Sequence, residues 1–238
     1  MDRHERRGAA RVVAATAAWA AAHSLLASVP AKATATRLLG TRNRNGLYRA
    51  GYNAFAVATF LLLIRFIRRQ PHRVFYRIPG PGAAAMRLAR LASLLYCVWG
   101  LFQVGLGGMS GLPHLFAWFA GRRHVPREPE GQTPPPHAPM SEAEVRRTGP
   151  FGLTRQALNF FLVPLLWLTP RMTSRLAAFN AVATAYLYLG SLHSDDRLRR
   201  FYGPAYDDAY RQRGVPLFLP RLGSTRARTP RKTFLQLV

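Results

Sequence analysis

Two pairs of carboxylates near the end of this chain are its most conspicuous candidates for chemistry. Asp195–Asp196 and Asp207–Asp208 are four of only ten acids, set against 34 lysines and arginines, and no carboxylate occurs between Glu5 and Glu128. Carboxylates attract cations, so one interpretation is a site for a positively charged ligand. The other is charge balance, because arginines follow each pair. For Asp207–Asp208 we favour charge balance.

A stripe of polar side chains leads into the first acid pair. At 100° per residue, one helix side would carry five of them: Asn180, Thr184, Tyr188, Ser191 and Asp195. Such a stripe either forms hydrogen bonds between helices or makes one wall of a ligand site that ends at Asp195 and Asp196. The pattern leaves both interpretations open.

A second candidate wall lies in "RRTGPFGLTRQALNF". Arg155 and Asn159 are spaced i and i+4, so they share one face of the helix that follows the glycines and proline. An arginine at a membrane boundary can instead simply extend to the lipid headgroups.

Three histidines in or near apolar segments, His23, His114 and His193, are candidate metal ligands, although such histidines more often form packing hydrogen bonds. Cys97 is the single cysteine, which excludes a disulfide framework or a cysteine metal cluster and favours a packing role.

The elements that must position these residues are apolar blocks of membrane-spanning type. We count five such blocks: residues 11–30, 48–67, 88–108 and 157–169, and the run that ends at His193. Residues 109–120 are expected to form a re-entrant or interfacial segment or a short extra span. The predicted fold is all-α, a polytopic integral membrane bundle of five to six transmembrane helices. A helical hairpin precedes a cytosolic C-terminal segment. The first block imitates a secretory signal but is longer than a typical signal core.

Composition divides the chain into four parts. Residues 1–120 carry the N-terminal transmembrane helices, 121–148 form an exposed loop rich in proline and charge, 149–220 hold the hairpin and C-terminal segment, and 221–238 are a basic tail. The net charge of +24 is mostly arginine that flanks apolar blocks, which favours lipid headgroups over nucleic acid as the partner.

Two C-terminal stretches together resemble the isoprenylcysteine carboxyl methyltransferase and phospholipid methyltransferase superfamily. They are "GPFGLTRQALN" and "DDRLRRFYGPAYDDAYRQRGVPLFLP", and the resemblance covers roughly residues 147 to 220. Members share a Gly-Pro-aromatic start, an Arg-His-Pro-type motif, a helical hairpin, a Glu-Glu pair, a Gly-x-x-Tyr segment and a Val-Pro ending. In the N-terminal half, "HSLLAS" and "LYRAGYNAFAVATF" resemble NnrU-like membrane proteins.

The resemblance implies an S-adenosylmethionine pocket at the cytosolic membrane face and an acceptor that arrives from the bilayer. The implied cofactor-binding residues are Arg155, Asn159, His193, Asp195, Asp196 and Tyr206. The chain departs from the family pattern because "RQA" replaces Arg-His-Pro and aspartates replace the two glutamates.

The leading hypothesis is therefore a methyltransferase in a bacterial inner membrane, with its C-terminus in the cytoplasm, that acts on a lipophilic or small acceptor. The alternatives are an NnrU-like haem protein with His23 and His193 as ligands, and a non-catalytic membrane relative.

Overall fold

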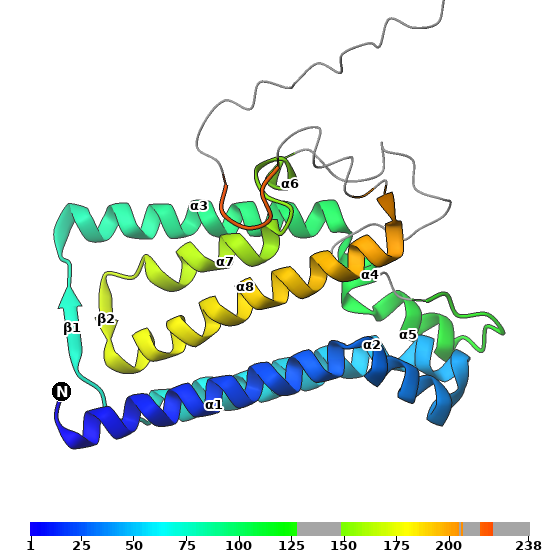
Figure 1. Ribbon diagram of the computed structural model, residues 1–238, viewed down its shortest axis with the longest axis horizontal. Coiled ribbons are helices and arrows are strands. Elements are labelled where there is room, and N and C mark those ends of the chain that lie inside the picture. Colours follow the sequence, from blue (N-terminus) through cyan, green and yellow to red (C-terminus); the bar gives the residue numbers. More distant parts are fainter. Residues whose placement is uncertain (128–148, 205, 207–214, 221–238) are drawn as a thin grey trace, which may run out of the picture.

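The computed structural model describes residues 1–127, 149–204, 206 and 215–220, and this part of the chain is mostly helical. Four long helices run along the molecule (Figure 1): α1 (Arg3–Ala27), α2 (Val29–Arg68), α3 (Gly80–Val104) and α8 (Ser174–Tyr202). The shorter α7 (Ala157–Trp167) lies between α3 and α8, and α1 packs on both α2 and α8. Two small helices, α4 (Leu106–Ser110) and α5 (Leu112–Phe119), lie near one end of the bundle, and the short α6 (Pro150–Leu153) packs beside α3 and α7.

Three helices, α1, α2 and α3, are long and apolar enough to cross a membrane. In the most apolar windows of these helices only 17%, 11% and 17% of the residues are buried inside the molecule. Large side chains such as Leu62, Leu88 and Phe102 are about two-thirds exposed. Apolar faces this extensive are a liability in water and suit a lipid environment. These three long apolar helices indicate a helical membrane protein.

The five to six predicted spans exceed the three helices that meet these criteria of length and hydropathy. The apolar helix α7 has only 11 residues, whereas a crossing helix needs about 20. Pro164 lies inside it, and the chain leaves the helix soon afterwards, at Leu168. The 29-residue α8 is long enough, but the polar stripe, the acid pair and several arginines make it too polar to meet the hydropathy criterion.

The arginine-rich connector before the second predicted block is itself helical. It joins the apolar segment in the 40-residue α2, which is interrupted only at Gly40, where φ is +75°. A left-handed φ is accessible to glycine at little cost, so the chain bends there and resumes the helix. The predicted connector therefore becomes the first half of a long, kinked helix.

Residues 109–120 do not make an extra span, because α4 and α5 have only five and eight residues. Side chains of α2 hold this segment by its backbone: Arg42 donates to Trp118 O at 2.9 Å, and Asn53 donates to the carbonyls of Met109 and Ser110, each at 2.9 Å. The outer side stays apolar, since Phe116 is 66% exposed. Of the predicted alternatives, an interfacial or re-entrant segment fits these lengths.

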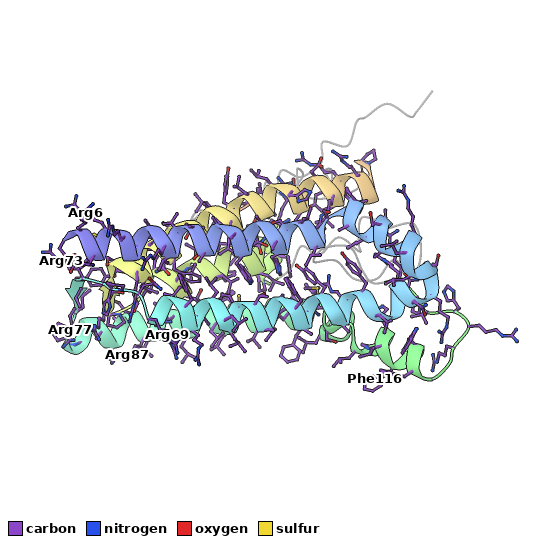
Figure 2. The ribbon with its side chains drawn as sticks, turned by 90° about the horizontal axis from the view of Figure 1, so that it is seen from below. Arg6, Arg69, Arg73, Arg77, Arg87 and Phe116 are labelled. Carbon is purple, nitrogen blue, oxygen red and sulfur yellow. The ribbon has the colours of Figure 1, made fainter. Side chains whose placement is uncertain are left out.

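A two-stranded antiparallel ribbon, absent from the sequence predictions, closes the end of the bundle that carries the N-terminus (Figure 1). Its strands are β1 (Val74–Arg77) and β2 (Arg171–Thr173), with Val74 opposite Thr173 and Arg77 opposite Arg171. The ribbon ties the α2–α3 connection to the α7–α8 connection. Exposed arginines gather at this end (Figure 2), namely Arg6, Arg69, Arg73, Arg77 and Arg87.

Helix packing produces small separate cores rather than one large one. The core between α3 and α7 includes Cys97, Phe151, Leu158 and Phe161, and Cys97 contacts the carbonyl of Leu158 through its thiol. This placement agrees with the predicted packing role of the single cysteine. Another core, between α1 and α2, is built on Val12 and Ile67.

Candidate functional site

The structure brings three of the predicted site residues into direct contact. Arg155 Nη1 lies 3.2 Å from Asp195 Oδ1, and the Tyr206 hydroxyl donates to the same oxygen at 2.7 Å. Arg199 approaches the other carboxylate oxygen at 3.3 Å. The side chain of Asp195 is only 6% exposed, so its charge is buried and compensated by two guanidinium groups.

Asp196 has different surroundings, although it is the neighbouring residue. Its side chain is 53% exposed, and its carboxylate pairs with Arg200, one turn later, at 2.9 Å. Successive residues of a helix point about 100° apart, so one aspartate faces the protein and the other faces outward. The two aspartates of the first acid pair therefore pair with different arginines, Asp195 with Arg155 and Arg199 and Asp196 with Arg200. The second pair, Asp207–Asp208, lies outside the described residues.

The two stretches that carry the C-terminal resemblance meet in space around Arg155. The backbone N–H groups of Arg155 and Gln156 donate to the carbonyls of Pro216 and Leu217, at 2.9 and 3.2 Å. The Thr154 hydroxyl also donates to Leu217 O. The Val-Pro ending is thus hydrogen-bonded to the segment that starts α7, and this contact places Arg155 beside Asp195.

Gln156 is fully buried, and neither atom of its side-chain amide has a hydrogen-bond partner among the described residues. Buried polar groups are nearly always paired with protein, water or a ligand. Sequence reasoning noted this residue only as a departure and assigned it no role.

The polar stripe on α8 mainly bonds α7. Asn159 donates to the Ser191 hydroxyl at 3.0 Å, Asn180 donates to Leu166 O at 2.6 Å, and Trp167 donates to Thr184. These bonds also show that α7 and α8 run antiparallel. Of the two interpretations of the stripe, hydrogen bonding between helices accounts for most of it.

A cavity of about 310 Å³, here called the central cavity, opens between α1, α2 and α8. Two of the sequence segments that resemble NnrU-like proteins line it, "HSLLAS" through His23 and Ser24 and "LYRAGYN" through Arg49, Tyr52 and Asn53. From the C-terminal part the lining includes Asn159, Tyr186, His193, Ser194 and Arg197. The two halves of the chain therefore share one cavity.

Hydrogen bonds fix much of the cavity wall. His23 Nε2 and the Tyr52 hydroxyl are 2.5 Å apart, and the His23 ring stacks on Trp19 with centroids 5.0 Å apart. Arg49 donates to Met109 O at 3.1 Å. His23 Nδ1 is buried without a partner in the described part of the chain. It is a polar group that a bound molecule could satisfy.

The charged groups in the lining of the central cavity are all basic: Lys32, Arg49 and Arg197 line it, and no carboxylate among the described residues does. Three tyrosines, Tyr48, Tyr52 and Tyr186, supply aromatic surface. Such a lining can bind an anionic group through its cations and a cationic group through its aromatic faces. Neither Asp195 nor Asp196 belongs to this wall.

The described histidines are not gathered with other metal-binding side chains. Within the described residues no group of three or more His, Cys, Asp or Glu side chains is placed to hold a metal ion. His23 and His193 both line the central cavity, whereas His114 is buried in α5.

Sequence reasoning overlooked Arg49, Tyr52, Asn53 and Tyr186 as site residues. A usable signal was present for the first three, since their spacing of i, i+3 and i+4 puts them on one helix face of an otherwise apolar block.

Comparisons with protein-family models, curated proteins and solved structures find no match to this chain.

Proposed function

We propose that this protein is an integral membrane methyltransferase that uses S-adenosylmethionine on a lipophilic or small acceptor, as a relative of the isoprenylcysteine and phospholipid methyltransferases. One observation supports this proposal above the others. Segments chosen from opposite halves of the sequence, by two separate resemblances, line the same cavity.

The cavity suits the parts of the cofactor. Arg49 would hold its carboxylate, and Tyr52 and Tyr186 would face its cationic sulfonium. When bound, the cofactor supplies an electrophilic methyl group. The cationic part is thus recognised by aromatic rings, where the sequence had suggested the aspartates.

Asp195 then acts as a positioning residue. Its contacts with Arg155, Arg199 and Tyr206 fasten the end of α8 to the start of α7 and to the segment after α8. Asn159 contributes in the same way through Ser191, and it also reaches the cavity wall. Methyl transfer depends on holding two reactants in line, so the rigidity of this wall matters.

In the proposed arrangement α1, the apolar half of α2, α3, α7 and α8 cross the bilayer, with α7 crossing incompletely as a helix. The central cavity and the C-terminal segment face the cytoplasm of a bacterial cell. The N-terminus and the end of α8 lie at opposite ends of the bundle in Figure 1, as five crossings require.

The test is binding of radiolabelled S-adenosylmethionine to the detergent-solubilised protein. We expect saturable binding that Arg49→Gln weakens about tenfold or more, because a charge-assisted hydrogen bond contributes about 1.5–3 kcal/mol. Arg65→Gln is the matched control, since Arg65 is an exposed arginine of the same helix that does not line the cavity.

The variants also separate the two accounts of the acid pair. If the cavity holds the cofactor, Asp196→Asn binds like wild type. If Asp196→Asn abolishes binding and Arg49→Gln does not affect it, the cofactor binds at the acid pair and not in the central cavity. No binding to folded wild-type protein would exclude the methyltransferase proposal.

Haem binding is the second candidate, because both predicted ligands, His23 and His193, line the central cavity. A haem protein would purify with a Soret band that His23→Ala or His193→Ala abolishes. A colourless preparation that gains no Soret band when haem is added would exclude it.

A further inference from the structure

A second cavity, of about 420 Å³, lies beside the turn between α1 and α2. Its lining comes from three places: Ser28, Val29 and Pro30 at the start of α2, Arg127 after α5, and His193, Asp196, Arg197 and Arg200 near the end of α8. It shares His193 and Arg197 with the central cavity, so the two adjoin. We call it the arginine cavity.

Arginine dominates the described lining of the arginine cavity. Its cations are Arg127, Arg197 and Arg200, and Asp196, the one carboxylate in the described lining, pairs with Arg200 at 2.9 Å. A concave site lined mainly by one sign of charge focuses the local potential and attracts ligands of the opposite sign. A ligand that brings negative charge suits this lining.

Arg197 is the best-placed cation for a ligand. Its Nη1 donates to Ala27 O at 3.3 Å, which anchors the guanidinium at the C-terminal end of α1. Its Nε is buried and has no partner among the residues described. Because a guanidinium presents five N–H donors, most of the hydrogen-bonding capacity of Arg197 is left for a bound molecule.

The geometry points to a phosphate-bearing ligand, and we propose that the arginine cavity binds a phosphate group. Arginines approach it from the α5–α6 connection and from two successive turns of α8. A phosphate has oxygens pointing in several directions and can accept from donors on different sides, and arginine matches its geometry. The group can come from an anionic lipid headgroup or from a free phosphate compound.

This inference does not depend on the proposed methyl transfer, because it concerns a different cavity and a different ligand. His193, a predicted cofactor-binding residue, lines both cavities and would be the polar group between them.

The experiment measures the thermal unfolding midpoint of the full-length detergent-solubilised protein during titration with three probes. They are dioctanoyl phosphatidylglycerol, dioctanoyl phosphatidylcholine and inorganic pyrophosphate, because a ligand that binds only the folded state raises the midpoint saturably. A rise with phosphatidylglycerol alone identifies a lipid headgroup, and a rise with pyrophosphate identifies a free phosphate compound. No saturable rise with either anionic probe would overturn the proposal.

For each variant we expect a definite direction of change in the half-saturating concentration of the anionic probe. Arg197→Gln should raise the half-saturating concentration about tenfold, and Arg200→Gln, whose side chain is 80% exposed, about threefold. Asp196→Asn removes the only carboxylate in the described lining and should lower that concentration. Arg77→Gln, in the distant strand β1, is the control with the same charge change.

Equal responses in Arg197→Gln and Arg77→Gln would mean that the anions act through overall charge, and the proposal would fail. It would also fail if Asp196→Asn weakened the response. Arg200→Gln keeps the test decisive if Arg197→Gln does not fold, because Arg200 is exposed and its ion pair with Asp196 lies at the surface. Binding of S-adenosylmethionine to the wild type is a separate measurement, so failure of the phosphate proposal can be told apart from failure of the methyltransferase proposal.

Discussion

At the scale of single residues, Asp195 holds together three side chains of the C-terminal part, Arg155, Arg199 and Tyr206. The two arginines form ion pairs with its buried carboxylate, and the tyrosine hydroxyl donates a hydrogen bond to it. Removing one member of a buried ion pair leaves the other charge uncompensated, which costs more than the pair contributes. Asp195 should therefore matter for stability whether or not the protein is an enzyme.

We expect Asp195→Asn to lower the free energy of unfolding by about 3 kcal/mol. Asp196→Asn should lower it by less than about 1 kcal/mol, because its ion pair with Arg200 is exposed to solvent. Unfolding of both variants in detergent by denaturant titration measures the difference. Equal effects of the two substitutions would contradict the burial of Asp195.

At the scale of elements, the contact between α2 and α5 depends on a glycine that leaves room for a ring. A Cβ built on Gly46 would lie 2.5 Å from Trp118 Cβ and 2.7 Å from Trp118 Cγ. The indole is also fixed by its hydrogen bond to Asn43, at 2.8 Å. The helices approach closely here because the side chain on α2 is missing.

Gly46→Ala should therefore push α5 away from α2 and destabilise the protein by about 1–3 kcal/mol, as overpacking does. The control is Gly51→Ala on the same helix, where a Cβ meets nothing within 4 Å; there alanine should be neutral or stabilising by up to about 1 kcal/mol. Thermal unfolding of the two variants in one detergent compares them. A stable Gly46→Ala protein would show that the α2–α5 contact is loose.

At the scale of the whole molecule, the ribbon of β1 and β2 and the end of α8 lie at opposite ends of the bundle (Figure 1), and arginines occur at both. The positive-inside rule is a rule about the excess of basic residues between the two sides. Because basic residues occur at both ends of this bundle, the rule does not decide the orientation in the membrane, and a direct measurement is needed.

Cysteine labelling can make that measurement, because Cys97 is the single native cysteine and is buried. In a Cys97→Ser background, Arg77→Cys and Arg200→Cys place a thiol at the two ends. We expect a membrane-impermeant maleimide to label Arg77→Cys in intact spheroplasts and Arg200→Cys only after lysis. Labelling of both from the same side would contradict the proposed five crossings.

The sequence alone determined the class of the protein and much of its helical structure. Apolar blocks flanked by arginine predict membrane helices because a helix satisfies its own backbone hydrogen bonds without water. That logic is local, so it held for α1, for the apolar half of α2 and for α3. The same local patterns singled out Arg155, Asn159 and Asp195 before any contact was known.

Only the tertiary structure decided how those residues are used. Asp195 and Asp196 are identical in type and adjacent in sequence, yet one is buried against Arg155 and the other is exposed with Arg200. The ribbon pairs residues almost a hundred positions apart, and the central cavity joins His23 to His193. The ion pairs, the ribbon and the cavity all depend on contacts between segments that are distant in the sequence. The energies of such contacts depend on which surfaces meet when the helices pack, and residue spacing along the chain does not specify those surfaces.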